Sequence, residues 1–194
     1  KNTSASHNFA ALQSALHNNT TGTFNAAIGY TALCSNTTGN YNTALGCFAL
    51  YDNTTGCFNS AIGVNALINN TTGSHNFAAG RQSLYCNTTG SCNTAIGYFA
   101  LYKSLSGCHN FATGNGALYN NWGGCYNTAI GQAALKLNTT ASNNTALGSN
   151  SMKENTTGAH NTALGSDALD ANTTGATNTA IGNEALGSNT TGAK

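Results

Sequence analysis

The chain repeats one pattern every seventeen residues and never slips out of register. The consensus unit reads N-T-T-G-x-x-N-T-A-I/L-G-x-x-A-L-x-x, and its positions are numbered one to seventeen. The first Asn recurs at Asn19, Asn36, Asn53, Asn70, Asn87, Asn121, Asn138, Asn155, Asn172 and Asn189, and the copy at Ser104 keeps the same phase. A unit of this length is too short for a helical hairpin and is typical of one coil of a β-solenoid.

Glycines divide each unit into short segments. Position eleven is Gly in every copy after Leu12, and position four is Gly in nearly all, as expected at corners that need a positive φ or a close backbone approach. Between them, Thr- and Ile-containing stretches of four or five residues predict strands, and the missing 3.6-residue apolar period argues against helices. We therefore expect an all-β chain, a parallel β-solenoid of about eleven coils and roughly 50 Å in length.

The domain organisation follows from the unbroken repeat. We expect a single β-solenoid domain over residues 1–194. Lys1 and Lys194 both fall inside a repeat, so the chain is interpreted as a mature product or an excerpt from a longer array.

Positions eight and ten exchange volume along the chain. A Phe at position eight accompanies a small residue at position ten, as in the pairs Phe9 and Ala11, Phe77 and Ala79, and Phe111 and Thr113. Because alternate strand residues share a face, we interpret both positions as core positions beside the Leu of position fifteen. The invariant Ala of position nine is then predicted to point outward as a close-packing contact face, unless its uniformity only reflects recent copying of repeats.

Two asparagine columns are predicted to form hydrogen-bonded ladders. Stacked coils bring position-one amides together, and likewise the amides of position seven, so that each side chain can bond to the next coil. The position-seven ladder comprises Asn25, Asn42, Asn59, Asn76, Asn93, Asn110 and Asn127. The N-T-T segments are also N-glycosylation sequons, and the sequence leaves open whether those Asn residues face inward or carry sugars.

The composition excludes several classes of function. Charged residues make up 6% of the chain and its net charge is +1, so no basic surface is available to bind nucleic acid. No apolar run of eighteen residues exists, so we expect no membrane insertion. The few acids are dispersed without a partner base, so we expect neither an enzyme active site nor a cofactor.

Two groups of potential sulfur and nitrogen ligands stand out. Cys108 and Cys125 occupy position five of adjacent coils, within the Cα spacing that a disulfide permits. The odd count of seven cysteines leaves at least one thiol unpaired or bonded to another chain, and the cysteine usage suggests an extracellular setting.

Position six carries the second group. His75, Cys92 and His109 are donors suited to zinc or copper on three successive coils. The same column elsewhere holds Phe24, Tyr41, Phe58 and Tyr126, which favours the alternative of stacked flat side chains without a metal.

Aromatic residues gather at positions twelve, thirteen and sixteen in the first two-thirds of the chain. This aromatic stripe consists of Tyr30, Phe48, Tyr51, Tyr85, Tyr98, Phe99, Tyr102 and Tyr119. If the Leu of position fifteen is buried, position sixteen faces outward, and a contiguous exposed apolar stripe is typical of a contact surface. We expect it to be an assembly interface.

The segment Asn93–Gly97, N-T-A-I-G, with the following Ala100 and Leu101, resembles the head repeats of trimeric autotransporter adhesins. It is also similar to arrays in bacterial surface proteins and phage tail-fibre-like proteins. The resemblance covers the whole chain and implies a left-handed parallel β-roll, association of three chains, and adhesion without enzymatic activity. The seventeen-residue period is longer than that of the usual head repeat.

Two functions remain open at this point. The first is a structural or adhesive component of an extracellular or cell-surface fibre. We expect the chain to associate with itself as a homo-oligomer or filament through its ends, the Ala column or the aromatic stripe. The fibre would also contact a host surface or a glycan. The alternative is an ice-binding solenoid that uses the threonine columns of positions two and three. Thr20, Thr37, Thr54, Thr71 and Thr88 form the first of these columns.

Overall fold

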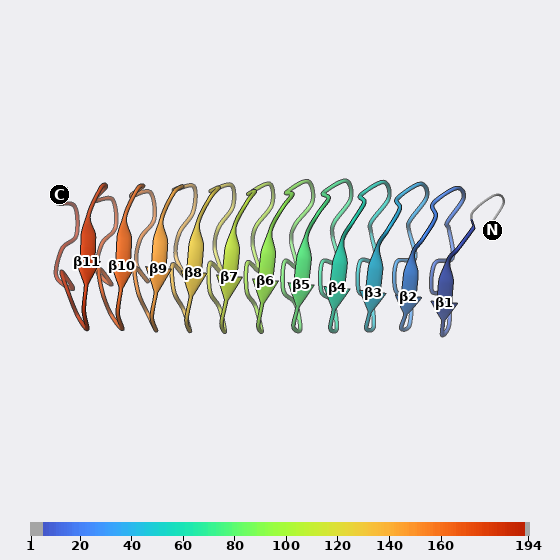
Figure 1. Ribbon diagram of the computed structural model, residues 1–194, viewed down its shortest axis with the longest axis horizontal. Helices are drawn as coiled ribbons and strands as arrows, with labels where there is room; N and C mark the ends of the chain where they lie inside the picture. Colours follow the sequence, from blue (N-terminus) through green and yellow to red (C-terminus); the bar gives the residue numbers. More distant parts are fainter. Residues whose placement is uncertain (1–5, 193–194) are drawn as a thin grey trace.

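The computed structural model describes residues 6–192, and these form a solenoid of stacked coils (Figure 1). Each coil contributes one strand of three residues, at the N-T-A-I/L segment, and the rest of the coil consists of turns and bends. The strands are β1 (Phe9–Ala11), β2 (Ala26–Ile28), β3 (Thr43–Leu45), β4 (Ser60–Ile62), β5 (Phe77–Ala79), β6 (Thr94–Ile96), β7 (Phe111–Thr113), β8 (Thr128–Ile130), β9 (Thr145–Leu147), β10 (Thr162–Leu164) and β11 (Thr179–Ile181). The predicted all-β parallel solenoid is confirmed, with shorter strands than expected.

The strands form one parallel sheet in the order β1 to β11. Each residue pairs with the residue seventeen positions later, for example Ala95 with Ala112. Hydrogen bonds between coils continue outside the strands, as from Leu33 N to Ala49 O at 2.9 Å and from Thr37 N to Thr54 O at 2.9 Å. Because the backbone is bonded around the coil, an inserted residue would disturb the pairing of its own coil with both neighbouring coils, which explains the unbroken register of the repeat.

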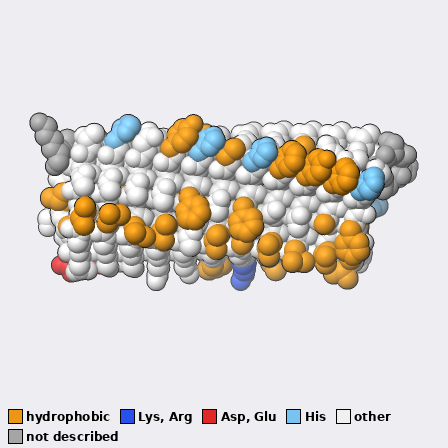
Figure 2. Space-filling model, viewed as in Figure 1, with side chains coloured by type: hydrophobic (Ala, Val, Ile, Leu, Met, Phe, Trp, Pro, Cys, Tyr) orange, Lys and Arg blue, Asp and Glu red, His pale blue; other side chains and the backbone are white. Residues whose placement is uncertain are grey.

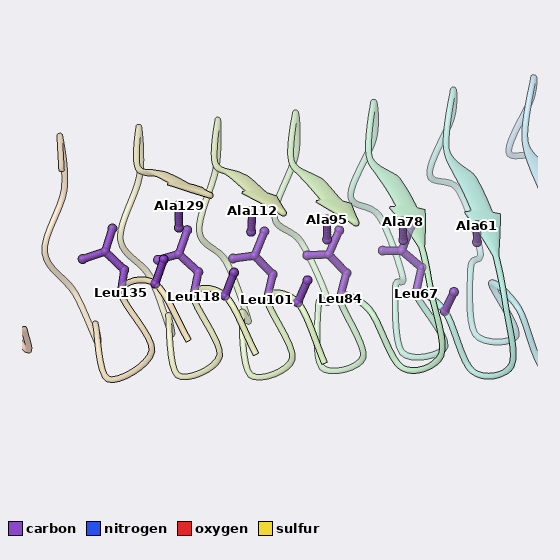
Figure 3. Packing of buried hydrophobic residues seen from close by; sticks show 14 of the residues in the cluster. Ala61, Leu67, Ala78, Leu84, Ala95, Leu101, Ala112, Leu118, Ala129 and Leu135 are labelled. Atoms are coloured by element: carbon purple, nitrogen blue, oxygen red, sulfur yellow. The ribbon is translucent and has the colours of Figure 1, made fainter. Parts of the chain in front are cut away.

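The core is a thin column of small and aliphatic side chains. Positions nine, fourteen and fifteen are buried along nearly the whole array, and Figure 3 shows the strand alanines pointing toward the leucines of the opposite wall, as Ala95 does toward Leu84 and Ala112 toward Leu101. Burial of each Leu contributes about 1.5–3 kcal/mol. The space between the walls holds an Ala opposite a Leu and has no room for a ring.

The prediction that positions eight and ten form the core was therefore wrong, as was the prediction of an outward Ala column. Ala78 at position nine is completely buried, whereas Phe77 at position eight is 37% exposed. The strand alternates faces as expected, but the opposite parity points inward, because only the Ala fits against the leucines. The Ala column is thus part of the core and cannot serve as a contact surface between molecules.

The corners use the left-handed backbone region more widely than the glycines indicate. Position eleven needs glycine, as at Gly46 with a φ of +137°. Positions six, thirteen and fifteen also have positive φ with ordinary side chains, as in Tyr41 (57°), Phe48 (57°) and Leu50 (52°). Such residues cost roughly 1–2 kcal/mol each, and the hydrogen bonds between coils offset this cost. The sequence does not reveal these positive φ angles, because positions six and thirteen hold many residue types and position fifteen holds Leu.

Candidate functional site

The described part of the chain, residues 6–192, contains no pocket and no group of three or more His, Cys, Asp or Glu side chains placed to hold a metal ion. The same residues contain no helix long and apolar enough to cross a membrane. The side chains of the described residues line up in columns along the rod, with one residue from each coil.

The position-seven asparagine ladder is confirmed, and it lies inside the molecule. Asn42 is representative, because its backbone N–H and side-chain Nδ2 donate to the Oδ1 of Asn25 at 2.9 and 3.1 Å, and Nδ2 also donates to the carbonyl O of Gly56 at 2.8 Å. Equivalent bonds from backbone N–H to the preceding Oδ1 link every member from Asn25 to Asn127. The ladder ties three successive coils together and has a structural role.

The position-one asparagines form a second ladder, which fails at one coil. The Nδ2 of Asn36 donates to the Oδ1 of Asn19 at 2.8 Å and to the carbonyl O of Gly39 at 3.0 Å. At the coil that begins with Ser104 the series is interrupted, and the Oδ1 of Asn87 and the Oγ of Ser104 are both buried without a hydrogen-bond partner. Burial of this column from Asn19 to Asn172 argues against sugars on those N-T-T asparagines, because a glycan does not fit inside the folded rod, whereas Asn189 in the last described coil is only partly buried.

Position six forms a column of stacked rings on the surface. The series His7, Phe24, Tyr41, Phe58 and His75 stacks with centroid separations of 4.7, 5.0, 4.9 and 4.9 Å and interplanar angles of 8° or less. His109 and Tyr126 stack in the same way at 4.9 Å, and Figure 2 shows the histidines interleaved with hydrophobic side chains along one band. The candidate metal site at His75, Cys92 and His109 is therefore not assembled, since each histidine stacks on an aromatic ring and the described residues hold no metal-binding group.

The aromatic stripe divides into two clusters. In the smaller one the ring of Phe48 makes edge contacts with Tyr30 at 5.5 Å and with Tyr51 at 5.7 Å. The two clusters together contain all eight residues predicted from the sequence.

The larger cluster centres on Tyr102. Its ring stacks between Tyr85 at 5.0 Å and Tyr119 at 5.1 Å, and Phe99 contacts it edge-on at 4.9 Å. Burial raises the pKa of Tyr102 above its ordinary value. The ring centroids of Tyr98 and Phe99 are 3.8 Å apart, and Tyr98 is 39% exposed. Arg81 and Lys103 lie within 6 Å of the rings of Tyr98 and Tyr119, at 5.7 and 5.6 Å, in cation–π contacts.

Cys108 and Cys125 are brought together by the stacking of their coils. Their Sγ atoms are 2.6 Å apart, and the backbone N–H of Cys108 donates to the Sγ of Cys125 at 3.1 Å. The hydrogen bond with Cys125, followed by burial, raises the pKa of Cys108 from 9.0 to about 11. Both residues are thiols in this structure, so the disulfide between them stays a prediction.

Sequence reasoning missed the outer face of the sheet. This outer sheet face consists of positions eight and ten of β1 to β11, and its large side chains include Ile28, Leu45, Ile62, Ile96 and Leu147, all between 38% and 45% exposed. Figure 2 shows the resulting hydrophobic band, which runs over the strands along the length of the rod. A signal was present in the sequence, because neither column contains a charged residue.

Comparisons of the chain with protein-family models, with curated proteins and with solved structures find no match. The resemblance to adhesin head repeats, the association of three chains and the left-handed coil stay predictions.

Proposed function

We propose that this protein is a structural or adhesive element of an extracellular fibre, in which rods associate side by side. The observation that carries the proposal is the outer sheet face, an apolar band that runs along the length of the rod and contains no charged residue. A contiguous exposed apolar surface of this length is typical of a contact between proteins.

The aromatic clusters give further support. They place exposed rings such as Tyr98 and Tyr30 on a rigid scaffold, and aromatic residues are enriched at the centres of protein interfaces. Tyrosine also combines an apolar ring with a hydroxyl group, which suits contacts with a host surface or a glycan. The seven cysteines support the extracellular setting of the proposal.

Negative-stain electron microscopy of the purified native protein, with and without reductant, tests the proposal. We expect filaments, or rods that are longer or thicker than one solenoid of roughly 50 Å. Loss of filaments in reductant would show that thiol chemistry contributes to assembly. Short, single, monodisperse particles under both conditions would refute it.

Two substitutions identify the surface that mediates assembly. Ile96→Lys places a charge on the outer sheet face, and Tyr98→Lys places one on the larger aromatic cluster. The matched control is Thr89→Lys, which adds the same charge at an exposed position-three site of the same coil. We expect the control to assemble normally and at least one of the other two variants to lose its filaments, because a charge buried in an apolar contact loses its hydration. Normal filaments from both would refute lateral contact through these surfaces.

Ice binding is a second candidate, supported by the exposed threonines of position three. Thr38, Thr55 and Thr72 project into solvent at the regular spacing of the coils. The position-two hydroxyls are used differently, as Thr37 Oγ1 donates to the carbonyl O of Thr54 at 3.1 Å. An ice binder would show thermal hysteresis that Thr72→Lys abolishes, and it would remain unassembled in the microscope. Thermal hysteresis equal to that of a non-binding protein of similar size would exclude this function.

A further inference from the structure

We propose that two copies of this chain pack face to face through their outer sheet faces, with the rods parallel and a two-fold axis along the rod. In this dimer, position eight of each coil lies against position ten of the same coil in the other copy. The inference rests on the proposed side-by-side association and names its first partner, a second copy of the chain.

The evidence is the volume exchange that the sequence displays at positions eight and ten. In each of the eleven strands one outward side chain is large and the other is small. The pairs are Phe9/Ala11, Ala26/Ile28, Thr43/Leu45, Ser60/Ile62, Phe77/Ala79, Thr94/Ile96, Phe111/Thr113, Thr128/Ile130, Thr145/Leu147, Thr162/Leu164 and Thr179/Ile181. Both positions point away from the core, so the filling of the core does not explain the exchange.

A two-fold axis along the rod turns this pattern into complementarity. The rotation reverses the strand direction and keeps the order of the coils, so position eight of one copy meets position ten of the other. Phe77 then meets Ala79, and Ile96 meets Thr94. Every coil presents a large side chain to a small one, twice per coil pair, as close packing requires.

Other arrangements of the same two faces fail this requirement. A two-fold axis along the strands sets position eight against position eight and position ten against position ten, which places most of the Ile and Leu side chains on one another. Slipping the parallel copies by one coil sets Phe77 against Ile96 or Ile62 and leaves a gap at Ala79. The pattern therefore specifies both the direction of the two rods and their register.

The charge distribution and the area of the face are compatible with burial. The charged residues of the described chain are Asp52, Arg81, Lys103, Lys136, Lys153, Glu154, Asp167, Asp170 and Glu184, and all occupy positions twelve, thirteen, sixteen or seventeen. No charge lies on the outer sheet face itself, so none has to be buried between the two faces. Eleven strands about 4.8 Å apart and about 10 Å long give about 500 Å² per copy, or about 1,000 Å² in total, which reaches the size of a specific interface before neighbouring columns are included.

The test uses two variants that should each dimerise poorly alone and should form a heterodimer when they are mixed. Ala79→Phe gives a chain with phenylalanine at both outward positions of β5, and Phe77→Ala gives a chain with alanine at both. In the proposed dimer the first variant clashes with itself and the second leaves cavities, whereas a one-to-one mixture restores a large residue against a small one on both sides of the axis. Sedimentation velocity measures the dissociation constant of the dimer in each case.

We expect a dimeric native protein, a dissociation constant raised at least about tenfold for each variant alone, and recovery of the native value in the mixture. The double variant Phe77→Ala/Ala79→Phe reverses the pair within one chain and should dimerise alone, which shows that a chain with the introduced phenylalanine folds. The matched control uses Thr89→Phe and Thr89→Ala, at an exposed position of the next coil. Each variant alone and their mixture should keep the native dissociation constant.

Two results would overturn the inference. One is a native protein that remains monomeric. The other is a mixture that dimerises no better than its components, since crowding between positions eight and ten of one strand would explain the exchange without predicting rescue between chains. Filaments formed by a chain that fails this test would leave the fibre proposal intact, whereas rescue without filaments would support the dimer and refute the fibre.

Discussion

The break in the position-one ladder predicts that Ser104→Asn stabilises the protein. Ser104 lies where other coils place an Asn, and the Oδ1 of Asn87 and the Oγ of Ser104 are buried without partners. In the intact coils the equivalent amide donates to the preceding Oδ1 and to the carbonyl O three residues later, as Asn138 does to Asn121 at 2.8 Å and to Ala141 at 3.0 Å. The introduced amide can make the same bonds to Asn87 and Gly107.

The size of the effect follows from the number of unsatisfied groups that the substitution eliminates, because Asn87 gains a donor and the Ser104 hydroxyl is removed. Relief of two buried unsatisfied groups at about 1–2 kcal/mol each gives an increase of about 2–4 kcal/mol in the free energy of unfolding. Ser104→Ala is the matched control, because it removes the hydroxyl and leaves Asn87 unsatisfied, so it should gain about 1 kcal/mol or less. Guanidinium denaturation curves, with hydrogen exchange of the coil at 104–120, measure the differences. If Ser104→Asn proves no more stable than Ser104→Ala, the hydrogen-bond reasoning fails.

A double-mutant cycle with Asn93→Ala examines the same reasoning independently. The Nδ2 of Asn93 donates to the carbonyl O of Gly107 at 2.7 Å, and among the described residues no second side chain does so. In an intact coil the carbonyl O of Gly73 accepts from both Asn59 at 2.8 Å and Asn70 at 2.9 Å. The loss in free energy of unfolding caused by Asn93→Ala should therefore be about 1–3 kcal/mol smaller in the Ser104→Asn background, where the introduced amide supplies the second donor, than in the native background. Strictly additive effects of the two substitutions would contradict this account.

Three further predictions concern single positions. Gly46→Ala should destabilise the protein by about 3 kcal/mol or more, measured by thermal unfolding, because its φ of +137° disfavours a side chain and a methyl group there would overlap the carbonyl group of Gly63. Oxidation with diamide should join Cys108 to Cys125, reducing the titratable thiols from seven to five (7 − 2), with loss of two hydrogen atoms by mass spectrometry and no change in a Cys125→Ser variant. Because the pKa of Cys108 is raised from 9.0 to about 11, its thiol contributes stability that is fully present below pH 9 and is lost as the pH rises through about 11. Thiolate absorbance across this range, compared with Cys108→Ser, measures the titration, and a midpoint near 9 would contradict the observed hydrogen bond.

Much of the architecture could be predicted because it depends on spacing alone. The seventeen-residue register, the coil number, the parallel pairing and both asparagine ladders all follow from a repeat without insertions. The clustering of Tyr85, Tyr102 and Tyr119 follows as well, since residues in one column of adjacent coils must be neighbours. The proximity of Cys108 and Cys125 has the same origin.

The conformation within a coil could not be predicted from spacing. The positive φ of Tyr41 and Leu50 has no signature in residue type, because the hydrogen bonds between coils, and not local preference, hold these corners. The interruption at Ser104 is visible in the sequence, but its consequence, an unsatisfied Oδ1 on Asn87, depends on how the side chains stack.

The sequence by itself determined that this chain is a solenoid, which columns it has and which residues share them, because a fixed period and parallel stacking leave no other arrangement. Only the tertiary structure decided which columns face inward. Positions eight, nine and ten are all largely uncharged and small or apolar, so hydrophobicity does not distinguish the two faces of the strand. The packing of the core distinguishes the two faces, because only the alanine of position nine fits against the leucines of position fifteen. The same steric limit places Phe77 and Ile96 on the surface, where a second molecule can cover them.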